Sequence, residues 1–195
     1  MKKKIINIII ILLVLVLYFF VYSYIYDNFR ERKRQETDKK IVDQIDDIIA
    51  NNTDNVTEKK VKVNNIKYTV LGKISIKRIN FYQSILKENT FKSLNVSVVK
   101  IAGPNLNMVG NVVIGGHNYM RKEYFYGIRK LRKGDIIKIT DLTGISIYYK
   151  VEYGRRTTEN DESYFKASKK NTKELTLVTC VPKSKYKYYV KAYEK

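Results

Sequence analysis

A long apolar segment lies close to the amino terminus of the 195-residue chain. Between Ile5 and Ile25, only Asn7 and Ser23 are clearly polar. An α-helix of this length spans about 30 Å, which is the thickness of the hydrocarbon core of a bilayer. The segment therefore predicts one transmembrane helix, so the rest of the chain is expected to be tethered to a membrane.

The residues around this segment indicate an uncleaved signal anchor over residues 1–26. Lysines occupy positions 2–4, and four tyrosines cluster at the far end, as in an interfacial aromatic belt. Residues 21–26 are bulky, whereas a cleaved signal peptide ends in small residues. Basic residues also follow the segment, so charge alone does not set its orientation.

The remainder of the chain is strongly cationic. Residues 61–195 hold 27 basic and 10 acidic side chains, a net charge of +17. Such a domain attracts polyanions, either phosphate-rich polymers or anionic lipid surfaces. The chain is also rich in Lys, Ile, Asn and Tyr, and this compositional bias explains the charge equally well. Charge alone therefore does not identify a partner.

Residues 27–60 are expected to form a juxtamembrane helix and a linker. Five aliphatic residues share one helical face: Ile41, Val42, Ile45, Ile48 and Ile49. This face could pack on the following domain, or the helix could be a stalk. A polar, turn-rich segment over residues 51–58 predicts the linker, and the folded domain is expected over residues 61–195.

The domain has the sequence pattern of a β-protein. Short β-branched or aromatic runs are separated by Gly, Asn, Asp or Lys-rich breaks. We predict strands at residues 68–71, 73–79, 96–101, 111–114, 135–140, 145–151, 175–179 and 186–193, and a short helix at 125–131. About eight strands with one or two short helices favour a closed or nearly closed β-barrel.

The chain contains one histidine and one cysteine, and both follow apolar strands. His117 comes after the sequence VVIGG, and Cys180 ends the sequence LTLVTC. One residue of each type excludes a disulfide within the chain and a zinc site of the finger or ribbon kind. Each could be structural alone, but together they are the minimum set for thiolate chemistry, because an imidazolium favours the thiolate and can protonate a leaving amine.

Several segments resemble those of the sortases, the membrane-anchored cysteine transpeptidases of Gram-positive bacteria. Residues 71–79 are similar to the opening strands of the family, although Lys77 stands where a proline is common. Residues 110–117 resemble its histidine segment, and residues 130–141 its next hairpin. Residues 176–180 match the TLxTC motif in full. The resemblance covers residues 66–193, which is nearly the whole domain.

This resemblance implies an eight-stranded sortase barrel that acts outside the cell, on a single-pass anchor in the cell membrane. Cys180 would attack the Thr–Gly peptide bond of an LPXTG-like sorting signal in a secreted protein, and His117 would protonate the departing amine. An amine of a peptidoglycan precursor, or another amine acceptor, would then resolve the thioacyl enzyme. The motif's Thr179 is expected to contact substrate, and no nucleic-acid partner is expected.

The third catalytic residue of the family is an arginine in a pattern like RxxVxA. Aligning Val190 and Ala192 with this pattern puts Lys187 at the arginine position. Lysine keeps the charge but loses the planar fork. Lys187 could substitute, Arg155 or Arg156 could supply the cation, or the enzyme could be weakened.

Three further expectations complete the hypothesis. No cofactor is expected, although the carboxylates at positions 159, 161 and 162 offer a possible calcium site. The compact size, with no second apolar segment, resembles the class A or class D sortases. The alternative function is a non-catalytic, membrane-anchored basic barrel that binds anionic wall polymers.

Overall fold

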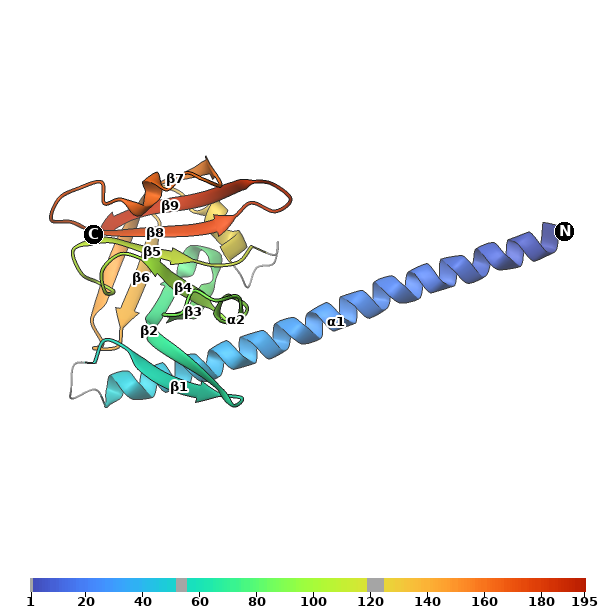
Figure 1. The fold of residues 1–195 in the computed structure, drawn as a ribbon, viewed down its shortest axis with the longest axis horizontal. Helices are drawn as coiled ribbons and strands as arrows, with labels where there is room; N and C mark the ends of the chain where they lie inside the picture. Colours follow the sequence, from blue (N-terminus) through green and yellow to red (C-terminus); the bar gives the residue numbers. More distant parts are fainter. Residues whose placement is uncertain (1, 52–55, 119–124) are drawn as a thin grey trace. The chain divides into compact units, whose positions relative to one another are not determined.

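The computed structural model describes residues 2–51, 56–118 and 125–195 (Figure 1). The chain divides into two compact units, Met1–Glu36 and Thr37–Lys195. Helix α1 (Lys2–Ala50) contributes to both units. Residues 52–55 of the expected linker lie outside the described residues.

The first unit consists of the amino-terminal part of α1. The side chains of residues 3–26 are exposed, including every aliphatic and aromatic residue of the apolar segment. By length and composition, α1 is able to cross a membrane. The sequence predicted an anchor and a separate juxtamembrane helix, whereas the structure has one continuous helix. No Gly or Pro interrupts residues 27–50, which explains why the helix continues.

The second unit is an eight-stranded β-barrel. In ring order, the strands are β2 (Ile66–Ile76), β3 (Phe81–Leu86), β4 (Val98–Ala102), β5 (Gly110–Gly115), β8 (Lys173–Cys180), β9 (Tyr186–Glu194), β7 (Ser146–Thr158) and β6 (Ile136–Asp141). Pairing of β2 with β6 closes the ring, and β1 (Lys59–Val63) adds a hairpin strand to β2. The predicted mostly-β barrel is confirmed.

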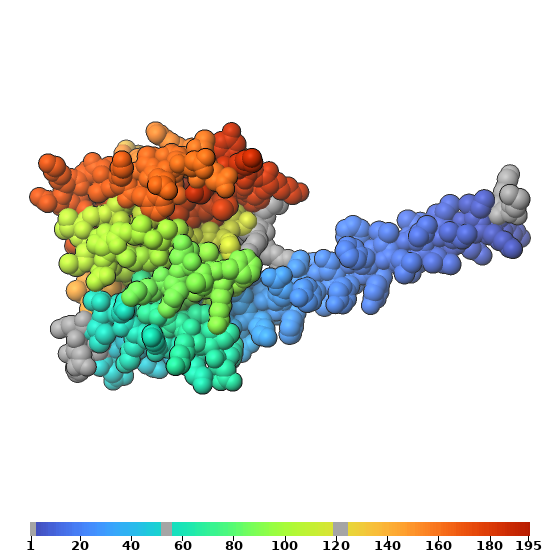
Figure 2. Space-filling model, viewed as in Figure 1, coloured from blue at the N-terminus to red at the C-terminus, as the bar shows by residue number. Residues whose placement is uncertain are grey.

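In the part of the chain that the structure describes, four short helical segments connect the strands. They are η1 (Lys77–Ile79), α2 (Phe91–Leu94), η2 (Phe125–Lys130) and η3 (Ser163–Phe165). The segment η2 is the predicted short helix, with 3-10 geometry. Figure 2 shows β7–β9, in orange and red, at one end of this unit and β1–β3, in cyan to green, at the other.

Alternation along the strands fills the barrel with apolar side chains. Buried residues from all eight strands form one core, among them Ile74, Ile114, Ile139, Leu177 and Val190. The residues between them point to the outer surface, as the period of a strand requires. Of two neighbouring residues on a strand, one therefore faces the core and the other faces the outer surface. The candidate site residues occupy outward-facing positions.

One glycine permits closure of the barrel. Gly72 is paired with Asp141 on β6, and a side-chain carbon at Gly72 would overlap the carbonyl oxygen of Thr140. The sequence treated Gly72 as a break between two strands, which is wrong: it is a bulge within the single strand β2. Conversely, β1 and β3 were not predicted. The barrel still has the expected eight strands, because β3 makes up for the two predicted strands that form the single strand β2, and β1 is a ninth strand outside the ring.

The carboxy-terminal part of α1 packs against the barrel. Ile41 and Ile45 are fully buried in a second apolar cluster with residues of β1 and β2, such as Val61 and Val70. Asp38 Oδ1 accepts hydrogen bonds from the backbone N–H of Ser84, at 3.2 Å, and from its hydroxyl, at 2.6 Å. The folded unit therefore begins at Thr37 rather than at the expected boundary of residue 61, because α1 supplies part of its core.

Substitution of Ile45 by alanine should test this packing. Loss of a fully buried isoleucine side chain should reduce the free energy of unfolding by about 2–4 kcal/mol. Denaturant unfolding of the full chain in detergent, followed by tyrosine fluorescence, measures the change. Asp43→Ala is the matched control on the exposed face of the same helix and should change stability by less than about 0.5 kcal/mol. Equal stability of both variants would show that α1 is not part of the fold.

Candidate active site

The predicted histidine and cysteine lie at the ends of two neighbouring strands. β5 and β8 are parallel, with Gly115 paired with Val178. Because the strands run in the same direction, the residues after Gly115 and Val178 leave the pair side by side (Figure 1). His117 and Cys180 are each two positions further along, so the register brings them together on adjacent strands.

Hydrogen bonds hold these two segments together beyond the end of β5. The backbone N–H of Gly116 donates to Val178 O at 3.2 Å, and the hydroxyl of Thr179 donates to Gly116 O at 2.7 Å. The side-chain amide of Asn118 donates to Cys180 O at 2.9 Å. The residues on both sides of His117 are thus bonded to residues 178–180, which fixes the backbone of His117 beside that of Cys180.

Close packing explains the two glycines before His117. A side-chain carbon at Gly115 would overlap Ile101, and one at Gly116 would lie 2.9 Å from the ring of Phe125 and 3.0 Å from Val98. The glycines therefore let β5 lie against its neighbours. A larger residue at Gly116 would require the ring of Phe125 or the side chain of Val98 to move, and one at Gly115 would require Ile101 to move.

His117 is half-buried, and its ring meets the ring of Phe91 edge to face, with centroids 5.8 Å apart. Burial lowers the pKa of His117 below its ordinary value of 6.5, because removal from water disfavours the charged imidazolium. Phe91 belongs to α2 and is itself 71% exposed. No local sequence pattern indicates this contact, because Phe91 and His117 are brought together by the fold.

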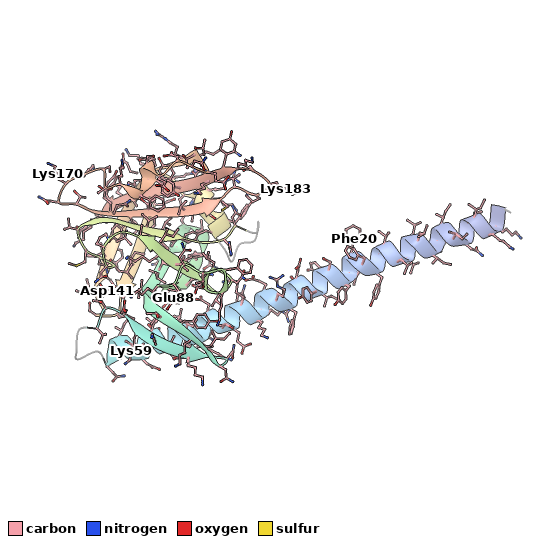
Figure 3. The ribbon with its side chains drawn as sticks, in the orientation of Figure 1. Phe20, Lys59, Glu88, Asp141, Lys170 and Lys183 are labelled. Carbon is pink, nitrogen blue, oxygen red and sulfur yellow. The ribbon has the colours of Figure 1, made fainter. Side chains whose placement is uncertain are left out.

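The thiol of Cys180 is accessible. Cys180 is the last residue of β8 and is exposed, whereas the six residues before it are buried. In Figure 3, the labelled Lys170 and Lys183 lie on the loops before and after β8 (Lys173–Cys180). A nucleophile at this position can meet a peptide that approaches from solvent.

Lys187 lies directly opposite Cys180 in the pairing of β8 with β9. Residues opposite each other in an antiparallel pair project from the same face. The half-buried side chain of Lys187 donates from Nζ to Glu159 O at 2.7 Å and lies 6.0 Å from the ring centroid of Tyr164. His117, Cys180 and Lys187 thus occupy one row across β5, β8 and β9.

The two alternative cations lie outside this row. The sequence placed Arg155 and Arg156 after the end of a strand, but β7 continues to Thr158, and the arginines face Tyr189 and Tyr188 of β9. Their guanidinium groups lie over tyrosine rings, that of Arg155 over Tyr153 at 5.6 Å and that of Arg156 over Tyr186 at 4.7 Å. Because side chains alternate along β7, Arg155 projects from the same face of the sheet as Lys187, but it lies two residues along β7 from Thr157, the partner of Lys187. Arg156 projects from the opposite face.

Thr179, which was expected to contact substrate, is only 3% exposed. Its hydroxyl is used in the bond to Gly116 O described above. In this structure Thr179 joins β8 to the histidine segment.

A buried polar network lies beside the row and fastens the connection between β7 and β8. Glu174 and Lys191 form an ion pair, with Oε2 and Nζ 3.1 Å apart and side chains 0% and 3% exposed. Glu174 also accepts backbone hydrogen bonds from Ser168 at 2.8 Å and Lys169 at 2.6 Å. Burial opposes ionisation of Glu174, but these amides and Lys191 outweigh it and hold its pKa below the ordinary value.

The network extends to β5 and to η3. Lys191 Nζ donates to Thr176 Oγ1 at 3.2 Å, and Thr176 Oγ1 donates to Asn111 Oδ1 at 2.8 Å. Asn111 Nδ2 donates in turn to Tyr164 O at 2.8 Å. The network therefore fixes Tyr164, whose ring lies beneath the ammonium of Lys187.

The acidic residues of the β7–β8 connection do not gather into a cluster. The carboxylate of Asp161 accepts hydrogen bonds from Thr157 Oγ1 and from the backbone N–H of Ser163. Within residues 2–51, 56–118 and 125–195, no group of three or more His, Cys, Asp or Glu side chains could hold a metal ion. The calcium site at Glu159, Asp161 and Glu162 stays an expectation from the sequence alone.

The barrel and its row of histidine, cysteine and lysine define a candidate thiol active site, and comparison with known proteins gives its family. The family model of the Sortase domain matches residues 74–195. Sortase A of Bacillus anthracis is 30% identical over 128 residues, which are 65% of this chain and 60% of that protein.

Solved structures of sortases have a similar fold. The sortase D5 transpeptidase of Clostridium perfringens has 25% identity and a TM-score of 0.59, with 85% of this chain and 98% of that chain covered. Sortase C1 of Streptococcus agalactiae has 24% identity and a TM-score of 0.58, over 65% of this chain and 67% of that chain. The chain belongs to the sortase family.

The environment of His117 predicts its titration. Because the chain has one histidine, a single imidazole signal reports its protonation by NMR once any affinity tag has been removed. The midpoint should lie below 6.5, since burial disfavours the cation. Phe91→Ala should expose the ring and move the midpoint up toward 6.5, whereas Met108→Ala, at another exposed apolar residue, should leave it unchanged. A midpoint above 6.5 in the unsubstituted protein would contradict this assignment.

Proposed function

We propose that the protein is a sortase-type cysteine transpeptidase that cleaves an LPXTG-like sorting signal between Thr and Gly. The observation that carries this proposal is the row of His117, Cys180 and Lys187 on three adjacent strands, held together by Asn118 and Thr179. In this proposal the exposed thiol of Cys180 is the nucleophile, His117 is the acid, and Lys187 supplies a cation on the other side of the thiol. Membership of the family supports the same reaction class.

In the first half-reaction, the thiolate of Cys180 attacks the carbonyl carbon of the threonine. When the tetrahedral intermediate collapses, the C–N bond breaks and the imidazolium of His117 gives its proton to the departing glycine nitrogen. The products are an acyl thioester on Cys180, a neutral imidazole and a free amine. Burial of His117 assists this step, because an imidazolium with a lowered pKa is a stronger acid.

In the second half-reaction, an acceptor amine attacks the thioester carbonyl. The neutral imidazole of His117 takes a proton from the amine as the C–N bond forms. The C–S bond then breaks, and Cys180 leaves as a thiolate beside the imidazolium. The ion pair with which the cycle began is restored.

Lys187 supplies the positive charge for the oxyanion in both half-reactions. An ammonium has three donors, and one is bonded to Glu159 O, so two remain for the substrate. The antiparallel register keeps this cation opposite the nucleophile. The ring of Tyr164 below the ammonium adds a cation–π contact that orients the side chain of Lys187.

The apolar part of α1 anchors the enzyme in the cell membrane, with the barrel on the outer side. Its substrates are secreted proteins that carry the sorting signal, and its acceptor is an amine of a peptidoglycan precursor or of another surface molecule. The apolar helix and the family support this location. The mechanism uses no metal or other cofactor.

Cleavage of a quenched fluorogenic sorting-signal peptide by the full chain tests the reaction. Cys180→Ala should abolish cleavage and also the acyl-enzyme adduct seen by mass spectrometry, because the nucleophile is lost. His117→Ala should lower kcat/KM by about 100-fold or more. Met108→Ala, at an exposed residue of the same domain, is the control and should retain full activity. Turnover by Cys180→Ala would rule out the covalent mechanism.

A second set of variants separates the candidate cations. Lys187→Met keeps an unbranched side chain of similar length but removes the charge. This change should lower kcat/KM by about 100-fold, the loss expected for one oxyanion donor. Lys187→Arg should retain activity, because its fork suits a carbonyl oxygen. Arg155→Ala and Arg156→Ala should each change kcat/KM by less than about threefold, since neither lies in the row. Loss of activity in an arginine variant, with Lys187→Met active, would assign the cation to β7.

A further inference from the structure

A second surface feature lies on the outer face of the barrel, away from the thiol. It is a pocket of about 520 Å³ over the seam where β2 pairs with β6. Four of its lining residues are cations: Lys73, Lys77, Arg78 and Lys138. We call it the basic pocket. In the ring order, β2 and β6 lie four strands from β8 and β5, so the pocket and the active site occupy opposite walls.

The floor of the basic pocket is a cross-strand row of four residues. Tyr82 on β3 is paired with Ser75 on β2, Ser75 with Lys138 on β6, and Lys138 with Tyr148 on β7. Three strand spacings separate the two tyrosines, a distance of about 14 Å. The row therefore presents a hydroxyl and an ammonium between two aromatic rings.

The cations of the pocket are only partly neutralised. Lys73 forms an ion pair with Asp46, and Arg78 Nε is 3.9 Å from Asp135 Oδ2. Asp135 is the one carboxylate among the lining residues. Within the described part of the chain, Lys77 and Lys138 form no ion pair, so two full charges face the pocket with their donors available.

The two aromatic residues of the pocket are about half exposed. Tyr82 is 51% and Tyr148 is 48% exposed, and each ring has a lysine ammonium near it, Lys73 at 5.7 Å and Lys138 at 5.8 Å. The two tyrosine rings expose apolar surface within one pocket, and grouped exposed apolar surface often marks a contact surface. Their ring faces can pack against carbon chains, while their hydroxyls and the neighbouring ammonium groups bind oxygen.

We propose that the basic pocket binds a linear phosphodiester polymer of polyol or sugar phosphates. The cations match phosphate oxygens, and the tyrosine rings match the carbon atoms between phosphates. The spacing favours a polymer over one phosphate, because a row of about 14 Å spans more than one repeat unit. The site is separate from the transpeptidase reaction and would hold the enzyme on a polyanion while the thiol on the opposite wall stays accessible.

Binding of a fluorescent glycerol-phosphate oligomer to the full chain in zwitterionic nanodiscs tests the proposal. At physiological salt, Lys77→Gln/Lys138→Gln should weaken binding by about tenfold or more, because two charged hydrogen-bond donors are lost. Lys60→Gln/Lys67→Gln removes the same charge from the exposed β1–β2 hairpin and should weaken binding by less than about twofold. Peptide cleavage should be unchanged in both double variants, which separates this site from the proposed active site.

Further arms identify the kind of ligand. Tyr148→Leu should weaken binding of the oligomer but not of inorganic phosphate, because the ring contacts carbon. Equal losses in the two lysine pairs would overturn the proposal, since binding would then depend on overall charge. Vesicles with anionic lipid, or a single-stranded DNA of equal charge, that bind as tightly and with the same dependence on Lys77 and Lys138 would also overturn it.

Discussion

The buried ion pair of Glu174 and Lys191 is the interaction on which the functional wall of the barrel depends. A charge without a partner in such a place would cost several kcal/mol, so removal of either residue would leave the other strongly destabilising. The pair is supported on every side: backbone amides bond the carboxylate, and Thr176 and Lys166 O accept from the ammonium. By fixing the β7–β8 connection, it holds the backbone of Tyr164 and so the surroundings of Lys187.

The order of the strands brings the residues of the candidate active site together. β8 lies between β5 and β9, so Cys180 on β8 has His117 next to the end of one neighbouring strand and Lys187 on the other. The apolar residues of these strands fill the barrel, and the outer positions are free for polar chemistry. Asn118 and Thr179 then bond the strand ends together where regular pairing stops. Neither residue has to touch a substrate to matter for the proposed reaction.

Much of this arrangement follows from local sequence. The single His117 and Cys180 follow strongly apolar runs, and such runs identify strands whatever their partners are. Gly72 was misread because a glycine that marks a bulge looks the same as one that ends a strand. The sequence left open whether Ile41 and Ile45 pack on the domain, since amphipathicity does not reveal the partner of a helix. The ring of Phe91 against His117 depends on contacts between distant segments, which no local pattern contains.

The parallel pairing of β5 with β8 affects when the candidate active site forms during folding. Thr179 and Gly116, which join the two halves of the site, are 63 residues apart, and β6 and β7 must be accommodated between them. Contacts of such high sequence separation form late in folding, after the entropy of closing the intervening loop has been overcome. Until the barrel has closed, Cys180 therefore has no imidazole beside it. The proposed pairing of imidazole and thiol therefore exists only in the finished barrel and not in a partly folded molecule.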